Sequence, residues 1–460
     1  MGGSPLRLFR LTSGGARSLD RALGGGVVST PPVDALLDRL VDAGALHPVP
    51  SSTPVVGSWT SGDVTVVVPV RDHASELGRL LTSLRSDPCA AAGIVVVDDA
   101  SVLPRQVDDA IDAAARAVPA GPPLRRLRRQ VAGGPAAARN LGARSADTEF
   151  VAFVDADCVV TECWLVPLLG HLADPSVALV APRVAPAGNC AAGSSELIRA
   201  YEVDHSPLDL GTTPARVAAG TRVSYVPSAA VVVRRSVFES LGGFEESMRV
   251  GEDVDLVWRL TADGHRARYE PTSVVRHEVR GDLRSWLTQR VAYGSSAAAL
   301  DQRHPSQVAP VVMSPWSLAV WSLVAAGHPV LGAAVAAGTV ARLRSRLDDL
   351  PAAEVLRTGV HGHLGAGRQL ARAVLRVWWP VAVPAAVVSR RARRVVFASV
   401  AVEAAATWRP ASRRGLRQPL DPLRSAVLGL LDDVAYGGGV WLGAARRRSL
   451  RALLPRLSGT

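Results

Sequence analysis

The sequence predicts an α/β protein with a mainly parallel central sheet, followed by a helical and apolar C-terminal region. Between residues 63 and 303, runs of β-branched residues alternate with amphipathic stretches. Such alternation is typical of parallel strands joined by crossover helices. Beyond residue 303, long apolar stretches are broken by proline and glycine. With 460 residues, 48% hydrophobic and 20% charged, the chain is long enough for two or three domains and is not a disordered protein.

The first 54 residues are expected to form a small winged-helix-like piece. Residues 31–50 carry apolar side chains at helical spacing, and Gly44 marks the predicted end of this helix. A short strand is expected after it, and residues 6–11 are a candidate edge strand. The piece either packs on the next domain or recognises a peptide. The start of the chain opens abruptly, as if a longer version existed, and has no apolar stretch long enough for a signal peptide. The catalytic part is therefore expected in the cytosol.

The strands and helices of the central region can be placed along the chain. Residues 49–62 are rich in proline, serine and glycine and indicate a linker. After them, continuous apolar runs predict strands that are buried on both faces, with helices between them. The strands are expected at residues 64–70, 94–97 and 150–154, and the helices at residues 75–84, 107–118 and 135–145.

The region 304–460 is helical in pattern and holds several apolar stretches. Residues 311–340 are interrupted by Pro315 and by Gly327-His328-Pro329, which suits one kinked span or two half-length helices at a membrane surface. Further apolar or amphipathic stretches cover residues 374–388, 395–408 and 426–444, and arginines follow several of them. Two alternatives stay open. The region is a soluble bundle that covers the sheet, or it attaches the protein to the cytoplasmic face of the cell membrane.

Charge and cysteine content limit the function classes. The 52 basic residues are all arginine and outnumber the 41 acidic ones, which gives a net charge of +11. Such a surface favours anionic lipid or phosphate-bearing substrates. Nucleic acid is not expected as a partner, because aromatic residues make up only 5% and do not alternate with the arginines. The four cysteines (Cys89, Cys158, Cys163 and Cys190) fit neither a disulfide framework nor a zinc pattern, so we expect small buried hydrophobic residues in a reducing compartment.

Acidic residues follow three of the predicted strands. Asp72 comes after the first, Asp98 and Asp99 after the second, and Asp155 and Asp157 after the third. Ligands of open parallel sheets bind beyond the carboxyl ends of the strands. One such acid alone could simply cap a helix. Three strands that deliver acids to one edge indicate a binding site.

A glycine-rich turn adds a second feature to this edge. Gly133-Gly134-Pro135 opens a predicted helix that carries Arg139. Free backbone N–H groups at the start of a helix, with an arginine close by, favour an anion such as a diphosphate. The alternative is an ordinary helix start.

Together these segments resemble glycosyltransferase family 2, whose members have the GT-A fold. The nucleotide-sugar half of that family is similar to the segments VTVVVPVRD, IVVVDDAS, GGPAAARN and FVAFVDADC, and its acceptor half to SVFESLGGFEESMRVGEDVDLVWRLTADGH. The resemblance covers residues 64–280. It implies that Asp72 and Asp99 contact the uridine, with Asp98 a secondary candidate, and that Asp155 contacts ribose or metal. It also implies that Asp157 holds a divalent cation, that His277 completes the metal site, and that Asp253 is the general base.

Chemistry explains why a transferase needs these groups. Mg²⁺ suits carboxylate and phosphate ligands, and Mn²⁺ also tolerates imidazole. Either ion neutralises the charge that develops on a diphosphate leaving group. Glu252 and Asp253 open an amphipathic helix, whose dipole keeps them ionised and able to accept a proton. Helix capping is the alternative role for this pair. One carboxylate base with no second carboxylate as nucleophile predicts inversion at the anomeric carbon.

A narrower resemblance is to the glycosyltransferases of mycofactocin biosynthesis. It rests on GGSPLRLFRLT, LLDRLVDAGALHPVP, VRHEVRG and SWLTQRVAYGSSAAAL. It implies a membrane enzyme that adds β-linked glucose from UDP-glucose to a peptide-derived redox cofactor, pre-mycofactocin. Gln289-Arg290-Val291 departs from the Gln-x-x-Arg-Trp pattern of processive synthases, so long-chain synthesis is not expected. Two other functions remain open: a cell-wall rhamnosyl- or galactofuranosyltransferase with a lipid-linked acceptor, and a non-catalytic protein that binds nucleotide and peptide.

Overall fold

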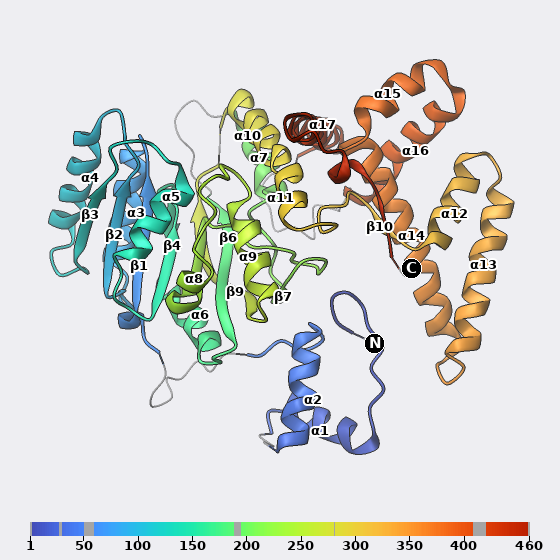
Figure 1. The fold of residues 1–460 in the computed structure, drawn as a ribbon, viewed down its shortest axis with the longest axis horizontal. Coiled ribbons are helices and arrows are strands. Elements are labelled where there is room, and N and C mark those ends of the chain that lie inside the picture. The colour runs from blue at the N-terminus through green and yellow to red at the C-terminus, as the bar shows by residue number, and fades with distance from the viewer. Residues whose placement is uncertain are drawn as a thin grey trace. The chain divides into compact units, whose positions relative to one another are not determined.

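The computed structural model describes residues 2–26, 30–49, 59–187, 195–279, 281–407 and 420–458. Cys190, one of the predicted buried cysteines, lies outside them. The chain divides into two compact units (Figure 1). One comprises Met1–Cys190 and Glu202–Val279, and the other comprises Ala191–Tyr201 and Arg280–Thr460. Each unit is described by itself.

The first unit is built on a nine-stranded mixed sheet. Its order is β3 (Leu124–Arg128), β2 (Gly93–Asp98), β1 (Val64–Val70), β4 (Phe150–Val154), β8 (Ala230–Arg234), β6 (Val177–Pro186), β9 (Arg266–His277) and β5 (Cys158–Val160), and β7 (Ala215–Val217) also pairs with β9. The four strands from β3 to β4 are parallel. Beyond β4, only the β6–β9 pair is parallel, so the predicted parallel sheet is confirmed for the first half.

Helices cover both faces of the parallel half. One face of β1 packs with the leucines of α3 (Ala74–Arg85) and with Val107 and Ile111 of α4 (Pro104–Ala117) in the main hydrophobic core. On the opposite face lies α5 (Pro135–Arg144), which approaches β1 so closely that a Cβ at Gly142 would collide with Val67. Because every residue of β1 and β4 is buried, the sheet is closed on both sides, as the continuous apolar runs predict.

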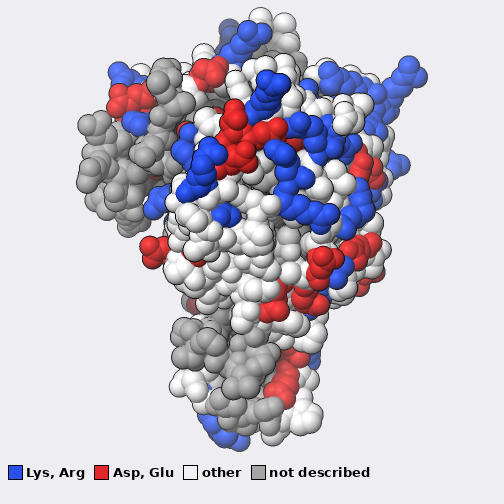
Figure 2. All heavy atoms as spheres, turned by 90° about the vertical axis from the view of Figure 1, so that its left-hand side faces the viewer, with Lys and Arg blue, Asp and Glu red and all other residues white. Residues whose placement is uncertain are grey.

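The expected elements of this half are confirmed, with small shifts at their ends. The strands at residues 64–70 and 150–154 match, and the others differ by one to three residues. β3 is not foreseen, because its sequence LRRLR is basic and half-exposed. This strand lies at the edge of the sheet, where charged side chains oppose pairing with other chains. The surface on this side of the protein carries interspersed basic and acidic groups (Figure 2).

The N-terminal piece differs from the expectation. The helix predicted from residue 31 forms as α2 (Pro31–Asp42), but a second helix, α1 (Ser13–Leu23), precedes it. Described residues 6–11 form no strand beyond an isolated bridge between Gly2 and Arg7, and none follows α2 up to residue 49. In place of a winged helix, the described part is a helix pair. The leucine-rich segment before α1 could not be told from a strand by its pattern alone.

The second unit is mainly helical. Its helices are α10 (Leu283–Ser295), α11 (Ala297–Arg303), α12 (Pro315–Ala325), α13 (Pro329–Arg346), α14 (Ala352–Arg376), α15 (Trp379–Val388), α16 (Arg390–Thr407) and α17 (Pro422–Arg447). The stretch at residues 311–340 forms two helices and not one continuous helix, because Gly327 at φ 93° breaks it and Pro329 starts α13. Helices α10 and α17 pack with their backbones close, since a Cβ at Gly294, Gly439 or Gly443 would meet main chain.

By length and apolar character, none of the described helices qualifies alone as a membrane span. Helices α14 and α15 qualify only as a pair, and they are bent by 87° where they meet.

Candidate active site

The acids after β1 and β2 lie on neighbouring loops, but their roles differ. The Asp98 side chain is fully buried, and its oxygens accept hydrogen bonds from the Ser101 backbone N–H (2.9 Å) and Arg128 Nε (2.9 Å). Asp72 is exposed, and its Oδ1 accepts a bond from the Val102 N–H at 2.6 Å. Asp98 therefore stabilises the loop after β2 from within. Asp72, in contrast, stays accessible at the surface.

Two residues at these strand ends have left-handed backbones. Asp72 has φ 60° and Ala100 has φ 58°. A left-handed conformation of a residue other than glycine costs about 1–3 kcal/mol and concentrates at functional sites. The Asp72 N–H donates to Ser101 Oγ at 3.0 Å, so the two loops hold each other in this shape.

The glycine-rich turn is occupied by Asp99. The Gly133 and Gly134 N–H groups donate to Asp99 Oδ1 (2.9 Å) and Oδ2 (2.7 Å), and Arg129 Nε lies 3.1 Å from Oδ1. The expectation that these glycine N–H groups are free for an anion is therefore wrong. The turn needs an acceptor, and the nearby Asp99 supplies it.

Arg139 connects three parts of the site. Its guanidinium is buried on α5 and donates to Asp155 Oδ1 after β4 (2.5 Å) and to Glu252 Oε1 (3.0 Å). Glu252 is the first residue of α9 (Glu252–Ala262), whose N-cap Gly251 has φ 85°, a conformation that favours glycine. These bonds bring the strand end and the start of α9 together.

Asp253 lies beside this clamp with backbone partners. Its Oδ1 accepts from its own helix, at the Val254 N–H (2.8 Å), and its Oδ2 lies 3.4 Å from the Ser228 nitrogen. Burial raises the pKa of Asp253, and burial together with Asp253 raises the pKa of Glu252 to about 7. Two acids with raised pKa values next to a buried arginine are typical of a functional site.

Asp157 and His277 form the second part of the site. Asp157 precedes β5 and His277 ends β9, and these strands pair antiparallel with Cys158 opposite His277. His277 Nε2 lies 3.3 Å from Asp157 Oδ2, and Asp157 Oδ1 is buried with no hydrogen-bond partner in the described structure. Although burial opposes ionisation, His277 lowers the pKa of Asp157 overall. An ionised carboxylate with an unfilled oxygen beside an imidazole fits a divalent cation.

Comparisons with known proteins show the family to which this chain belongs. Residues 65–242 match the family model described as Glycosyl transferase family 2. The chain is 42% identical to the pre-mycofactocin glycosyltransferase of Mycobacterium tuberculosis, over 99% of this chain and 94% of that protein. The chain is a family 2 glycosyltransferase. It is also 28% identical to the O-antigen biosynthesis protein RfbC of Myxococcus xanthus, over 59% of this chain and 22% of that protein.

A solved structure similar to this glycosyltransferase is the mannosyltransferase PcManGT from Pyrobaculum calidifontis in complex with GDP-Man and Mn²⁺. It has 20% identity and a TM-score of 0.41, and the match covers 75% of this chain and 90% of that one. The first unit of the glycosyltransferase has the GT-A fold, with a parallel half that ends in the acids and a mixed half that brings α9 to the same edge.

Two supporting residues of the glycosyltransferase were not predicted. Asn140 of α5 bonds both the Phe244 oxygen and the Phe244 nitrogen, at 2.9 Å each, and so holds the loop that leads to α9. Arg129 accompanies Asp99, as described above. Asn140 follows Arg139 in the segment GGPAAARN, but the pattern does not show which distant loop it holds.

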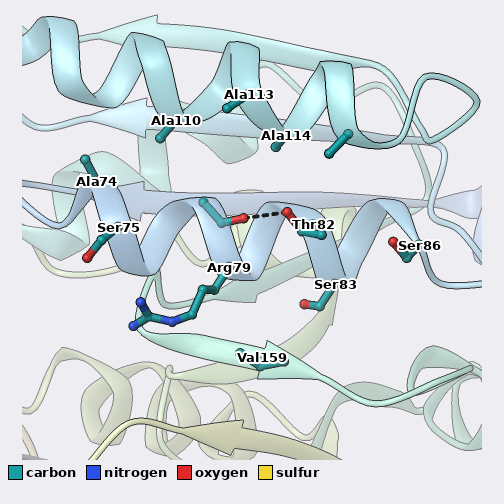
Figure 3. A pocket seen from close by; sticks show the side chains of 12 residues that line it. Ala74, Ser75, Arg79, Thr82, Ser83, Ser86, Ala110, Ala113, Ala114 and Val159 are labelled. Carbon is teal, nitrogen blue, oxygen red and sulfur yellow. Dashed lines mark hydrogen bonds between the residues drawn. The ribbon is translucent and has the colours of Figure 1, made fainter. Parts of the chain in front are cut away.

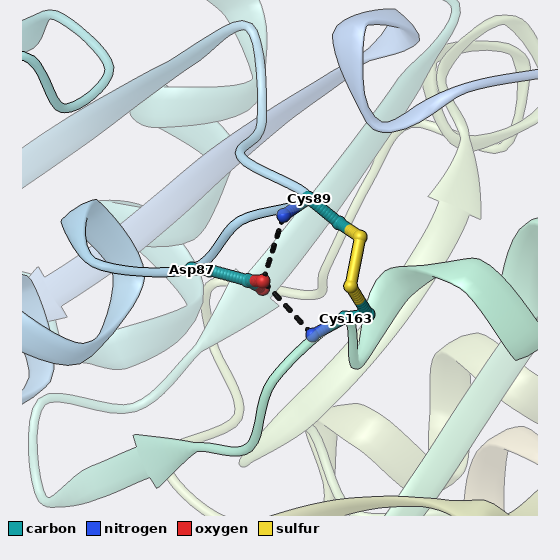
Figure 4. Close-up of side chains that lie close together, drawn as sticks. All are labelled: Asp87, Cys89 and Cys163. Atoms are coloured by element: carbon teal, nitrogen blue, oxygen red, sulfur yellow. Dashed lines mark hydrogen bonds between the residues drawn. A yellow bond between two sulfur atoms is a disulfide. The ribbon is translucent and has the colours of Figure 1, made fainter.

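A disulfide corrects the cysteine prediction. Cys89 and Cys163 are bonded although 74 residues apart, and both are partly exposed (Figure 4). Asp87 Oδ1 accepts from the N–H groups of Cys89 (3.0 Å) and Cys163 (2.8 Å). These three residues lie as close as metal ligands would, but bonded sulfurs are not thiolates and do not fit a metal. Cys158 is buried and forms no disulfide, as expected.

A surface groove of about 730 Å³ runs between α3 and α4 (Figure 3). Alanines 110, 113 and 114 of α4 and hydroxyl groups of α3 line it, and Arg79 lies at its edge. Arg79 is paired with Glu278 at 2.6 Å. Since none of the predicted acids lines this groove, it is separate from the transferase site.

Proposed function

We propose that this glycosyltransferase transfers glucose from UDP-glucose to pre-mycofactocin, a peptide-derived acceptor, with inversion and with a divalent metal. The observation that carries the proposal is the Arg139 clamp, which holds Asp155 and Glu252 at the sheet edge next to Asp253. The acceptor is supported by the 42% identity to the pre-mycofactocin glycosyltransferase, which extends over almost the whole chain.

Asp157 and His277 are the proposed metal ligands. The unfilled Oδ1 of Asp157 and the imidazole nitrogen of His277 offer one hard and one borderline donor, which suits Mn²⁺ and also admits Mg²⁺. When bound, the ion would neutralise the negative charge of the diphosphate leaving group. Oxygen atoms of the donor diphosphate would complete the ligand set that these two side chains begin.

Asp253 is the proposed general base. Glu252 is held by Arg139, whereas the oxygens of Asp253 face only backbone N–H groups. Burial raises the pKa of Asp253 by more than the backbone hydrogen bonds and the nearby Arg139 charge lower it, so Asp253 keeps its affinity for a proton. Asp253 would take the proton from the acceptor hydroxyl during attack. Because Asp155 is bonded to Arg139, no second carboxylate is offered as a nucleophile, which favours inversion.

The donor is proposed to bind along the loops after β1 and β2. Asp72 is exposed there and supports the predicted contact with the uridine. Asp99 has both oxygens bonded and is proposed to shape the pocket through Gly133 and Gly134. Asp98 is fully buried, so its proposed role is to hold the loop through Ser101.

Attachment to the cytoplasmic face of the membrane is part of the proposal. Helix α15 has no buried residue, and Val381, Val383, Val387 and Val388 expose half or more of their surface. Arginines at positions 390, 391, 393 and 394 follow directly in α16. An apolar helix next to a basic run favours insertion into the surface of an anionic membrane.

The test uses the full-length protein with UDP-glucose, pre-mycofactocin and Mn²⁺ or Mg²⁺. We expect UDP release, a mass gain of one hexose on the acceptor, and a β-linkage in the NMR spectrum of the product. Release of UDP that persists unchanged in EDTA would contradict metal dependence. Preference for UDP-galactofuranose or dTDP-rhamnose in a donor panel would favour the cell-wall alternative.

A further inference from the structure

Arg268 of β9 is a buried cation that forms no ion pair with any described residue. Only 3% of its surface is exposed, and its Nε and Nη1 have no hydrogen-bond partner in the described structure. Burial, with Arg266 as the next cause, lowers the pKa of Arg268 to about 10. Leaving a buried charge unpaired is strongly unfavourable, so the side chain requires an explanation.

A second arginine lies directly opposite. Arg216 of β7 is the antiparallel partner of Arg268, so both side chains project from the same face of the sheet. Like charges in this arrangement are destabilising. Within the described residues, no side-chain hydrogen bond or ion pair involves Arg216. The two arginine side chains therefore lie side by side on one face of the sheet, and neither forms an ion pair with a described residue.

The carboxylates nearby already have partners. Both oxygens of Asp42 bond Arg266 (2.7 and 3.1 Å), and Asp174 lies 3.1 Å from the same guanidinium. Glu270 accepts from Thr272 and lies 2.8 Å from His171 Nε2. Asp38 also lies 3.3 Å from Arg266 Nη1. These four acids interact electrostatically with Arg216, Arg266, Arg268 or the neighbouring His47. Within the described part of the chain, none of these acids forms an ion pair with Arg268 or Arg216, although Asp42 and Asp174 stabilise the charge of Arg268 from a greater distance.

The segments outside the described residues add no acidic side chain to this part of the molecule. In the sequence they contain no aspartate and no glutamate. No side chain of those segments can therefore supply the missing carboxylate.

We propose that Arg216 and Arg268 bind an oxyanion, the phosphate or carboxylate group of a small molecule, at a site separate from the transferase centre. Guanidinium groups match the two-oxygen edge of both groups. The partners of Arg268 and His277 on β6, Val180 and Pro186, are six residues apart, which is about 20 Å along a strand. Asp42, the last residue of α2, bonds Arg266 two residues earlier in the strand, so the site lies where the N-terminal helices contact the sheet.

The experiment measures anion binding by calorimetry and thermal unfolding of the full-length protein. Inorganic phosphate and sodium acetate are titrated separately, with ionic strength held constant by KCl. We expect saturable binding of one of them and a rise in melting temperature, because a ligand that binds only the folded state stabilises it. The anion that binds identifies the phosphate or the carboxylate class. These measurements need neither UDP-glucose nor acceptor, so they do not depend on the proposed function.

Three variants make the test specific. Arg268→Met and Arg216→Gln should each weaken anion binding about tenfold or more, since each removes one charged donor fork. Arg105→Gln removes an exposed arginine of α4 and should bind as the wild type does. Without anion, Arg268→Met should unfold at the wild-type temperature or above it, because the unpaired charge is gone. If Arg268→Met does not fold, the more exposed Arg216 carries the test.

Two results would overturn the proposal. One is the absence of saturable binding of either anion to the wild-type protein. The other is wild-type anion affinity in Arg216→Gln or in a folded Arg268→Met.

Discussion

Asp157 Oδ2 lies 3.3 Å from His277 Nε2, although 120 residues separate the two in the sequence. The contact follows from antiparallel pairing of β5 with β9, which places Cys158 opposite His277. The Glu278 N–H adds a bond to the Asp157 carbonyl at 3.0 Å and fixes the same register. A potential metal site is thus built from backbone pairing at the margin of the sheet.

The first prediction concerns this pair. His277→Ala should weaken Mn²⁺ binding about tenfold or more, because it removes one of two protein donors. Calorimetry with Mn²⁺ alone, together with UDP release at varied Mn²⁺, would measure the effect. His265→Ala serves as the control, since His265 is a partly exposed histidine that pairs with Asp263. Equal Mn²⁺ affinity in His277→Ala and wild type would exclude His277 as a ligand.

The second prediction concerns the base. Asp253→Asn should lower kcat about 10²–10⁴-fold and leave the Kd for UDP nearly unchanged, because a neutral amide cannot accept the proton from the acceptor hydroxyl. Steady-state UDP release and UDP calorimetry separate the two effects. Asp263→Asn changes an exposed acid at the end of the same helix and should keep normal activity. A kcat close to wild type in Asp253→Asn would mean that another group is the base.

The third prediction is a pH dependence. The base acts only when ionised, and burial raises the pKa of Asp253, so kcat/KM should rise with pH above the usual carboxylate range. Burial and the charge of Asp253 raise the pKa of the adjacent Glu252 to about 7, so Asp253 ionises first, while Glu252 is still protonated. Glu252→Gln resembles this protonated form and should leave the rising limb of the kcat/KM profile at its wild-type position. Loss of the limb in Glu252→Gln would show that Glu252, and not Asp253, is the group that titrates.

The fourth prediction concerns the stability of the clamp. Arg139→Met leaves Asp155 and Glu252 without their shared cation in a buried place. We expect the free energy of unfolding to fall by about 3–5 kcal/mol, the usual effect of breaking a buried ion pair from one side. Urea denaturation followed by circular dichroism measures it. Arg144→Met, at the exposed end of α5, should change stability by less than about 0.5 kcal/mol.

The fifth prediction concerns the disulfide. Closing the 74-residue separation between Cys89 and Cys163 should stabilise the folded state by about 2–4 kcal/mol. Oxidised protein should therefore melt at a higher temperature than protein treated with a dithiol reductant. The Cys89→Ser/Cys163→Ser variant should melt as the reduced protein does and should not respond to the reductant. Alkylation with mass spectrometry shows which cysteines react before reduction, and we expect Cys89 and Cys163 to be protected.

The sequence by itself determined the local elements and the chemistry at their ends. Continuous apolar runs predicted β1 and β4 to the residue, and the acids that follow them, together with Glu252 and Asp253, marked the site. Such patterns are local, because burial on both faces requires apolar residues at every position of a strand. The edge strand β3 was not predicted, because its sequence contains three exposed arginines and no continuous apolar run.

Only the tertiary structure decided which acids stay available. Asp98 and Asp99 are adjacent at the end of the same strand, and the sequence does not distinguish their roles. In the structure, Asp98 accepts hydrogen bonds from Arg128 and Ser101. Asp99 accepts them from Gly133 and Gly134. The Cys89–Cys163 bond and the facing pair Arg216 and Arg268 are likewise invisible along the chain. Hydrogen bonds, disulfides and unpaired charges depend on which groups lie close together in space. Pairing between strands that are distant in the sequence determines which groups these are.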